Sequence, residues 1–331
     1  MRQALLRTLF LGAFSALALP ALAQPALAQN WPTRPVTMVV PFVAGGPIDT
    51  VARIVAPSLS ETLGQSVIVE NVGGAGGMTG ALRVAKAPPD GYQLVLGNVG
   101  THVVSQALHK NPPYNSLVDF VPVGLFADLS LVLVTRKDLP VSNLPEFIAY
   151  AKANQGKMQF GSASAGSATH LACALLNAAA GVNVLHVPYR GGAPAMQDLI
   201  GGRIDYLCLD TPVVIPQIES GQIKAMAILT QGRSASLPNL PSAQEQGLAG
   251  FEAANWASFF FPKGTPAAIV QKLNAATIAA IENPAIRKHM KDVGIDPVAP
   301  DRRSPEYLAK FTESEIAKWG GAIKAAGVTA E

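Results

Sequence analysis

The sequence predicts an α/β fold in which helices flank mostly parallel sheets, and three patterns support this prediction. Between residues 36 and 230, apolar runs alternate with helical segments, which is typical of βαβ units. The first run, residues 36–43, is apolar throughout, as expected for a strand covered on both faces. Two long extended runs, residues 120–135 and 251–262, interrupt the alternation and indicate that the chain crosses between two lobes.

The alternation assigns each element in turn. Strands are expected at residues 36–43, 66–72, 93–98, 131–135, 158–161, 184–189, 204–210 and 224–230. Helices are expected between them at residues 50–63, 78–86, 101–108, 144–153, 168–179, 193–200 and 212–220.

The carboxyl-terminal part changes character and is expected to be helical. Thr265, Asn283 and Ser304 are each followed by a proline. A capping residue before a proline at the first helical position is a common way to begin a helix. Three helices are therefore expected, at residues 266–282, 284–293 and 305–326.

The two extended runs divide the chain into lobes. A chain that crosses at both runs leaves a first lobe, builds an inserted second lobe and returns, with the two crossing segments as a hinge. A cleft then lies between the lobes, and ligands of open α/β sheets bind at the carboxyl ends of the strands. The expected first lobe comprises residues 30–130 and 252–331, and the expected second lobe comprises residues 131–251.

The amino terminus has the pattern of a secretion signal. Arg2 and Arg7 are basic, residues 5–19 are apolar, and the small residues Ala23 and Ala28 offer cleavage sites. We therefore expect residues 1–28 to be a signal peptide, cleaved after residue 23 or 28. The apolar segment is too short to span a membrane, so the mature chain is expected to be soluble and outside the cytoplasm.

Charge and motifs argue against several classes of ligand. The formal net charge is +3, and loss of Arg2 and Arg7 lowers it by two, so no basic footprint for nucleic acid remains. The glycine-rich run at residues 72–79 fails the G-x-G-x-x-G register, and no Walker lysine follows any glycine loop. Cysteine and histidine spacings match no zinc pattern. We expect neither a cofactor nor a metal.

A strand-to-helix turn at Ala44, Gly45 and Gly46, here named the glycine loop, is the first candidate site. Glycines let the backbone come close to a ligand, and the helix that begins near Asp49 or Thr50 adds positive potential and free N–H groups. Such a turn suits an anion such as a carboxylate. The alternative is a plain tight turn in which the glycines serve geometry alone.

A second loop at residues 161–167, here named the serine loop, also lies between a strand and a helix. Hydroxyl groups at Ser162, Ser164, Ser167 and Thr169 are able to donate hydrogen bonds, as are the N–H groups of the turn. One such loop is weak evidence for a site. Two loops, one in each lobe and each before a helix, favour an anion site between them.

Other polar residues follow strands on the expected cleft side. Asn98 and Thr101 either face the cleft or cap the next helix. Tyr189 is able to stack on a planar ligand, and Asp210 either receives a ligand amine or hydroxyl or caps the helix after it. The full set of candidate ligand-binding residues is Phe42, Ala44, Gly45, Gly46, Asp49, Asn98, Thr101, Ser162, Ser164, Ser167, Thr169, Tyr189 and Asp210.

The chain has two cysteines, Cys173 and Cys208. Two is the number needed for one disulfide in an exported chain. A closed loop of this length would stabilise the fold by about 3–4 kcal/mol in the chain-entropy model. The alternative is two separate buried thiols, because free cysteine favours protein interiors.

Six blocks along the chain carry a resemblance: VVPFVAGGPIDTVAR, GGAGGMTGA, DGYQLVLGNVGTH, GSASAGSATHLA, HVPYRGGAPAMQDLIGGRIDY and GTPAAIVQKLNAA. In this order they resemble the Bug proteins, the solute-binding components of tripartite tricarboxylate transporters. The resemblance implies a two-lobed periplasmic binding protein of type II, a Venus flytrap. It also implies a small carboxylate ligand, which is a dicarboxylate, an acidic amino acid or an aromatic or nicotinic acid.

The resemblance further implies how the carboxylate is held. Backbone amides and bridging waters would bind it between Ala44, Gly45 and Gly46 on one side and Ser162, Ser164 and Thr169 on the other. The chain departs from the usual family pattern in two places, where Asn98-Val99-Gly100 replaces Thr-Asn-Gly and where Pro47 follows the glycines.

Two hypotheses for function follow. The first is a monomeric, non-catalytic binding protein that captures a carboxylate for a transporter or sensor, with the membrane components of a tripartite transporter as possible partners. The second is a secreted serine hydrolase, because the segment around Ser164 approaches the G-x-S-x-G elbow and His170 is near in sequence. The second hypothesis fits less well, because the elbow begins with Ser162 and the chain order of a triad is not met.

Overall fold

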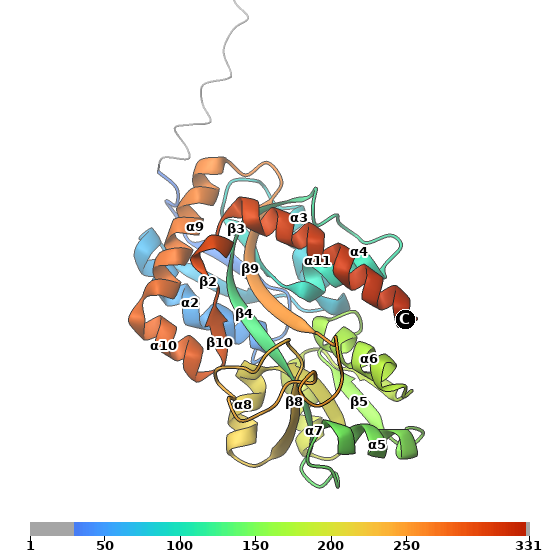
Figure 1. Cartoon of the computed structure of the whole chain (residues 1–331). Helices are drawn as coiled ribbons and strands as arrows, with labels where there is room; N and C mark the ends of the chain where they lie inside the picture. The colour runs from blue at the N-terminus through green and yellow to red at the C-terminus, as the bar shows by residue number, and fades with distance from the viewer. Residues whose placement is uncertain (1–29, 329–331) are drawn as a thin grey trace, which may run out of the picture.

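The computed structural model describes residues 30–328, and the predicted signal peptide lies outside these residues. Within the described part, ten strands form a curled sheet in the order β2-β1-β3-β9-β4-β7-β5-β6, with β8 and β10 also paired to β4. Helices cover both faces of the strands, and the two ends of the sheet form two lobes (Figure 1). The α/β prediction is therefore confirmed.

The first lobe begins with parallel strands. β1 (Val36–Val40) lies between β2 (Val67–Asn71) and β3 (Gln93–Gly97) and pairs in parallel with both. The connections carry the helices α2 (Pro47–Leu63), η1 (Ala75–Gly77), α3 (Met78–Ala85), η2 (Gly100–Val104) and α4 (Ser105–Leu108). Figure 1 shows α2 on one side of these strands and α3 and α4 on the other.

Two long strands join the lobes. β4 (Phe120–Arg136) pairs antiparallel with β9 (Ala254–Pro262) up to Ser130, and from Leu131 onward it pairs with strands of the second lobe. β4 is therefore a single strand that runs through both lobes. The sequence places an extended run here, but a local pattern cannot show which partners it has on each side.

The second lobe contains β5 (Gln159–Ser162), β6 (Leu185–Pro188), β7 (Tyr206–Asp210) and β8 (Ile223–Ile228). β5 pairs in parallel with β6 and β7, whereas β7 and β8 pair antiparallel with β4. Its helices are α5 (Leu144–Asn154), α6 (Ala168–Ala180), α7 (Gly192–Ile200) and α8 (Thr211–Glu219). Parallel pairing thus holds among the strands that crossover helices connect, and antiparallel pairing enters through β4 and β9.

The carboxyl-terminal part returns to the first lobe as α9 (Ala267–Glu282), α10 (Pro284–Asp292), β10 (Ile295–Pro297), η3 (Pro300–Arg302) and α11 (Pro305–Ala325). The caps at Asn283 and Ser304 are confirmed, since both side chains accept hydrogen bonds from the first turn. The prediction that Thr265 caps a helix is wrong. Pro266 is the N-cap of α9, and the Thr265 hydroxyl donates to the Pro262 carbonyl instead.

Several elements differ from the prediction. α2 begins at Pro47, three residues before the predicted start, because proline is well tolerated in the first turn of a helix. The helix expected at residues 101–108 begins as the π-helical turn η2. The short strand β10 was not predicted, because a three-residue strand has no detectable period.

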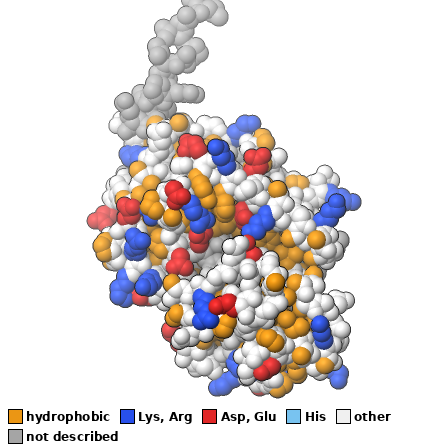
Figure 2. Space-filling model, in the orientation of Figure 1, with side chains coloured by type: hydrophobic (Ala, Val, Ile, Leu, Met, Phe, Trp, Pro, Cys, Tyr) orange, Lys and Arg blue, Asp and Glu red, His pale blue; other side chains and the backbone are white. Residues whose placement is uncertain are grey.

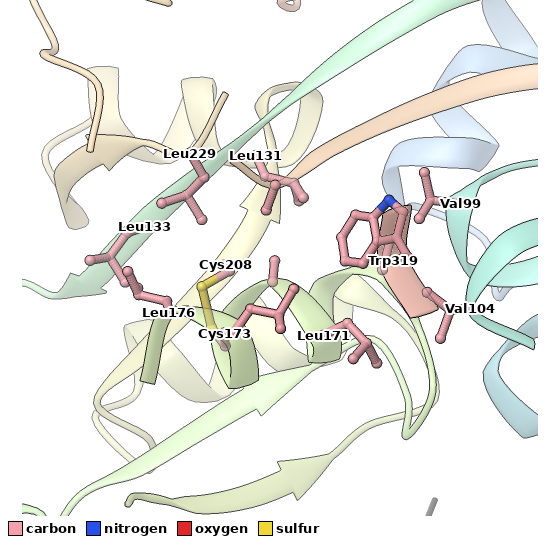
Figure 3. Close-up of a cluster of buried hydrophobic side chains, with 14 of the residues drawn as sticks. Val99, Val104, Leu131, Leu133, Leu171, Cys173, Leu176, Cys208, Leu229 and Trp319 are labelled. Atoms are coloured by element: carbon pink, nitrogen blue, oxygen red, sulfur yellow. A yellow bond between two sulfur atoms is a disulfide. The ribbon is translucent and has the colours of Figure 1, made fainter. Parts of the chain in front are cut away.

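The hydrophobic core is continuous between the lobes. One cluster of buried side chains includes Val99 and Trp319 from the first lobe and Leu171 and Cys173 from the second (Figure 3). Within this cluster the sulfur atoms of Cys173 and Cys208 are joined in a disulfide between α6 and β7. The cluster packs the two lobes together on the side where α11 crosses α6 and η2.

The described residues include no membrane-spanning helix, and the face drawn in Figure 2 carries charges of both signs. Within residues 30–328, no helix is both long and apolar enough to cross a bilayer. On the face drawn in Figure 2, basic and acidic side chains are interspersed over both lobes. This distribution agrees with the small net charge of the sequence.

Candidate ligand-binding site

A pocket lies between the lobes at the carboxyl ends of the parallel strands, where α/β proteins bind ligands. It is narrow in this structure, with a cavity volume of about 20 Å³. Its wall comprises Phe42, Gly46, Pro47, Ile48, Asn98, Ala163, Ser167, Ala168, Thr169, Gly192, Asp210 and Asn255. No lysine or arginine is among these wall residues.

Four helices begin at this pocket. Its wall includes the first residues or N-caps of α2 (Gly46), α6 (Ser167), α7 (Gly192) and α8 (Asp210). The first N–H groups of a helix have no partner inside the helix, and they carry the positive end of its dipole. Several such ends around one pocket favour an anion without any basic side chain.

The glycine loop is held from behind by a carboxylate. One Asp49 oxygen accepts from Gly45 N at 2.9 Å and from Arg53 Nε at 2.8 Å, and the other accepts from Asn71 Nδ2 at 2.9 Å. Burial alone would raise the pKa of Asp49, but the hydrogen bonds from Arg53, Gly45 and Asn71 outweigh it and hold this pKa below its usual range. Asp49 therefore positions the loop, and its oxygens do not face the pocket as free groups.

The serine loop is held by neutral groups. Thr169 Oγ1 accepts from Ala163 N at 2.9 Å, and Ser167 Oγ donates to the Ser164 carbonyl at 2.7 Å. His170 Nδ1 accepts from Gly166 N at 3.2 Å, and its ring stacks on that of His186 at 4.0 Å. Burial, with a smaller contribution from His186, lowers the pKa of His170 to about 3, so its imidazole is neutral at physiological pH.

A third loop follows β3 at Asn98. The Asn98 side-chain oxygen accepts from Thr101 N at 3.1 Å, and Thr101 Oγ1 donates to the same oxygen at 3.2 Å. His102 is fully buried and stacks on Phe260 at 3.8 Å, and burial lowers its pKa to about 3. Thr101 and His102 thus support the loop, and only Asn98 reaches the pocket wall.

Asp210 is the only ionisable residue in the pocket wall. Its side chain is fully buried, and Asn255 Nδ2 donates to Oδ1 at 2.8 Å. The second oxygen, Oδ2, is buried without a hydrogen-bond partner. Burial raises the pKa of Asp210 to about 7, although the hydrogen bond from Asn255 opposes the rise.

The lobes touch across the pocket. Gly76 N, from the first lobe, donates to Ser164 Oγ in the serine loop at 3.0 Å. A Cβ at Gly191, in the second lobe, would lie 2.3 Å from a Val43 methyl group in the first. No side chain fits at Gly191, so the close approach of the two lobes depends on a glycine there.

The structure places some predicted site residues on the pocket wall and others behind it. Those on the wall are Phe42, Gly46, Asn98, Ser167, Thr169 and Asp210. Behind the wall, Ser162 Oγ contacts His186 Nε2 at 2.7 Å, and the Tyr189 hydroxyl donates to Asp198 at 2.8 Å. The remaining predicted residues outside the wall are Ala44, Gly45, Asp49, Thr101 and Ser164.

Several wall residues were not predicted. Pro47, Ile48, Ala163 and Ala168 belong to the two predicted loops, but they offer no side-chain chemistry that would single them out. Gly192 lies in the Gly-Gly turn after Tyr189, where a close backbone approach could have been inferred. Asn255 is a polar residue inside an apolar crossing segment, and that contrast could have indicated a site residue.

The arrangement around Ser164 gives the hydrolase alternative no support. Ser164 Oγ accepts a hydrogen bond from Gly76 N, and the Nδ1 atom of His170 is occupied by Gly166 N. A nucleophilic serine needs a base within hydrogen-bond reach and a third group that orients the base. These bonds instead brace the loop and the contact between the lobes.

Comparison with known proteins agrees with this geometry. A family model described as the tripartite tricarboxylate transporter family receptor matches residues 51–328. Protein BugT of Bordetella pertussis is 36% identical over 300 residues, which is 90% of this chain and 91% of BugT.

Two solved structures are similar over nearly the whole fold. The periplasmic binding protein BugD is 41% identical with a TM-score of 0.88, covering 91% of this chain and 100% of BugD. MatC from Rhodopseudomonas palustris, solved with bound malate, is 38% identical with a TM-score of 0.86, covering 88% of this chain and 100% of MatC. The chain therefore belongs to the tripartite tricarboxylate transporter receptors, the Bug family of periplasmic solute-binding proteins.

Proposed function

We propose that this protein is a non-catalytic receptor that binds one small carboxylate in the pocket between its lobes. The observation that carries the proposal is the convergence of four helix amino termini on a pocket wall without lysine or arginine. Such a wall stabilises a carboxylate through backbone N–H groups and helix dipoles. The bound malate of MatC, a relative of the same fold, supports the same class of ligand.

The proposed lobes are residues 30–130 with 252–331, and residues 131–251, joined by β4 and β9. Because β4 changes partners between Ser130 and Leu131, the bend of closure is proposed to lie there. The ligand would stabilise the closed form by contacting the N–H groups of both lobes at once.

The proposed setting is extracytoplasmic. The amino-terminal signal pattern and the family match both support export with cleavage of the signal. The protein would act as a monomer that delivers its ligand to the membrane components of a tripartite transporter. The family supports that partner, and the mixed charges on the face in Figure 2 favour a surface contact without a strong electrostatic bias.

The test is a ligand panel on refolded protein, so that any acid carried over from the host is removed. Calorimetry and thermal melts would compare succinate, malate, glutarate, adipate and nicotinate with their neutral amides. At least one acid is expected to bind and to raise Tm, since a ligand at 100 times its Kd adds about 2.7 kcal/mol. The matched amide should have no effect.

Two results would contradict the proposal. One is a panel in which no acid binds, or in which the neutral amides stabilise the protein as well as the acids do. The other is turnover of simple esters that disappears in Ser164→Ala, which would restore the hydrolase alternative.

A further inference from the structure

Asp210 carries a buried acceptor without a hydrogen-bond partner. The side chain is 0% exposed and lies on the pocket wall, yet its Oδ2 atom has no partner among the described residues. A buried polar atom without a partner costs free energy, and a charged one costs more. A bound ligand that donates a hydrogen bond to this oxygen would remove that cost.

The orientation of Asn255 fixes which Asp210 oxygen is free. Asn255 Oδ1 accepts from Trp256 N at 3.0 Å and from Val99 N at 3.4 Å, so its amide group must turn toward Asp210. That amide donates to Asp210 Oδ1 at 2.8 Å. The neighbouring residues thus occupy one oxygen with a donor and leave the other without one.

Helix capping does not account for Asp210. It occupies the N-cap position of α8, but it makes no side-chain cap hydrogen bond to that helix. The sequence alone left capping and ligand contact as equal alternatives for this residue. The structure removes the first.

We propose that Asp210 selects carboxylates that carry a hydroxyl or ammonium group, because its free oxygen accepts a hydrogen bond from that group. This inference rests on the proposed function, because it assumes that the helix amino termini hold the carboxylate. The pocket then has two unlike ends, with N–H donors for the anion and one acidic acceptor for the donor. Burial raises the pKa of Asp210 to about 7, and a donor from the ligand would oppose that rise by stabilising the ionised form of the side chain.

Matched acids test the proposal on the wild-type protein. Succinate, L-malate and L-aspartate have the same carbon skeleton and differ in bearing no donor, a hydroxyl or an ammonium group. Glutarate, 2-hydroxyglutarate and L-glutamate repeat the comparison with one more carbon. In at least one set, a donor-bearing acid is expected to bind about 10–100-fold tighter than the plain acid, the usual range for a hydrogen bond to a charged group. Whichever of the two donor-bearing acids binds more tightly identifies whether the site prefers a hydroxyl or an ammonium group.

The variant Asp210→Asn changes the free acceptor to a donor. Asn255 Nδ2 would retain the oxygen of the new amide, and the NH2 group would then face the pocket. The preference for the donor-bearing acid should fall at least tenfold in this variant, whereas affinity for the plain acid should stay the same or rise. Asp198→Asn is the matched control, because Asp198 binds Tyr189 and Arg203 away from the pocket and should leave both affinities unchanged.

The outcomes separate this inference from the proposed function. If plain acids, or an acid outside both sets, bind and no donor-bearing acid binds tighter, the inference is wrong and the carboxylate receptor stands. Equal losses for every acid in a folded Asp210→Asn would give Asp210 a structural role and also overturn it. If no acid binds at all, the proposed function fails first. The wild-type comparison decides the matter even if the variant does not fold.

Discussion

The two loops that face each other across the pocket are held in place by different kinds of groups. A buried, ionised carboxylate holds the glycine loop, since Asp49 accepts from Gly45 N and pairs with Arg53. Hydroxyls and a neutral imidazole hold the serine loop, through Thr169 and His170. In both cases the bracing comes from behind. Pro47 has no N–H group and the His170 N–H donates to Ser167 Oγ, so a ligand is expected to use the N–H groups of Ile48, Ala168 and Thr169.

The serine loop also has a covalent support that the glycine loop lacks. The disulfide joins α6, which follows the serine loop, to β7, which ends at Asp210. Two parts of the pocket wall are thus fixed relative to each other inside the second lobe. Within the described residues, the first lobe contains no cysteine. Each lobe therefore preorganises its own half of the site, one by charge and the other by neutral packing and a cross-link.

Of the changes that test this difference between the loops, removing the disulfide is expected to lower the unfolding free energy most. In Cys173→Ser/Cys208→Ser, the loss of a cross-link that spans 35 residues should cost about 3–4 kcal/mol of unfolding free energy. Urea denaturation of the variant and of the wild type would measure it. A reductant should lower the stability of the wild type and leave the variant unchanged. A variant as stable as the wild type would show that packing alone holds α6 against β7.

Asp49→Asn should have the next largest effect. The amide keeps the size of the side chain but cannot accept from Gly45, Asn71 and Arg53 together, so we expect a loss of about 2–3 kcal/mol. Ligand affinity should fall as well, because the glycine loop loses its anchor. Arg53→Gln is the control, and it should cost less than about 1 kcal/mol because the Arg53 side chain is 55% exposed. Equal losses in the two variants would mean that the ion pair, and not the buried carboxylate, holds the loop.

The pH dependence of the serine loop is expected to be the smallest of the three effects. The pKa of His170 is 6.5 in the unfolded chain and about 3 in the folded protein, because burial disfavours the charged imidazole. Between these values the unfolded chain binds a proton that the folded protein does not. Stability contributed at His170 is therefore complete above pH 6.5 and falls by about 1.4 kcal/mol per pH unit below it.

The variant His170→Gln isolates this contribution. The difference in unfolding free energy between wild type and variant should shrink by about 1 kcal/mol from pH 6.5 to pH 5.5, and denaturation at each pH would measure it. Contributions from His102 and Asp210 are present in both proteins and cancel. The carboxylate of Asp49, whose pKa is lowered, should lose its contribution only below about pH 4. A difference that does not change with pH would mean that His170 has the same pKa in the folded and unfolded protein.

The loops and the fold class were readable from the sequence because they depend on local signals. Apolar runs, glycines and caps such as Asn283 and Ser304 act within a few residues, and the structure places helix starts close to where these signals predict them. The predicted pocket residues Gly46 and Ser167 lie at helix starts for the same reason.

Asp49 and Thr101 were predicted to contact the ligand, and in the structure both lie outside the pocket wall and hydrogen-bond to residues of their own loops, Gly45 and Asn98. Other roles depend on residues far apart in the chain. Asn255 is 45 residues from Asp210, and only the pairing of β9 and β7 with β4 brings the two side chains together. No local pattern encodes that distance.

The sequence by itself determined the alternation of strands and helices, the two glycine- and serine-rich turns and the family. Each of these depends on residues that are neighbours in the chain. The tertiary structure decided which of those turns meet and which side chains stay free. It paired Cys173 with Cys208, closed Ser164 against Gly76 and left one oxygen of Asp210 without a partner. The physical reason is that burial and hydrogen bonding are settled by all the elements that surround an atom, and these come from distant parts of the chain.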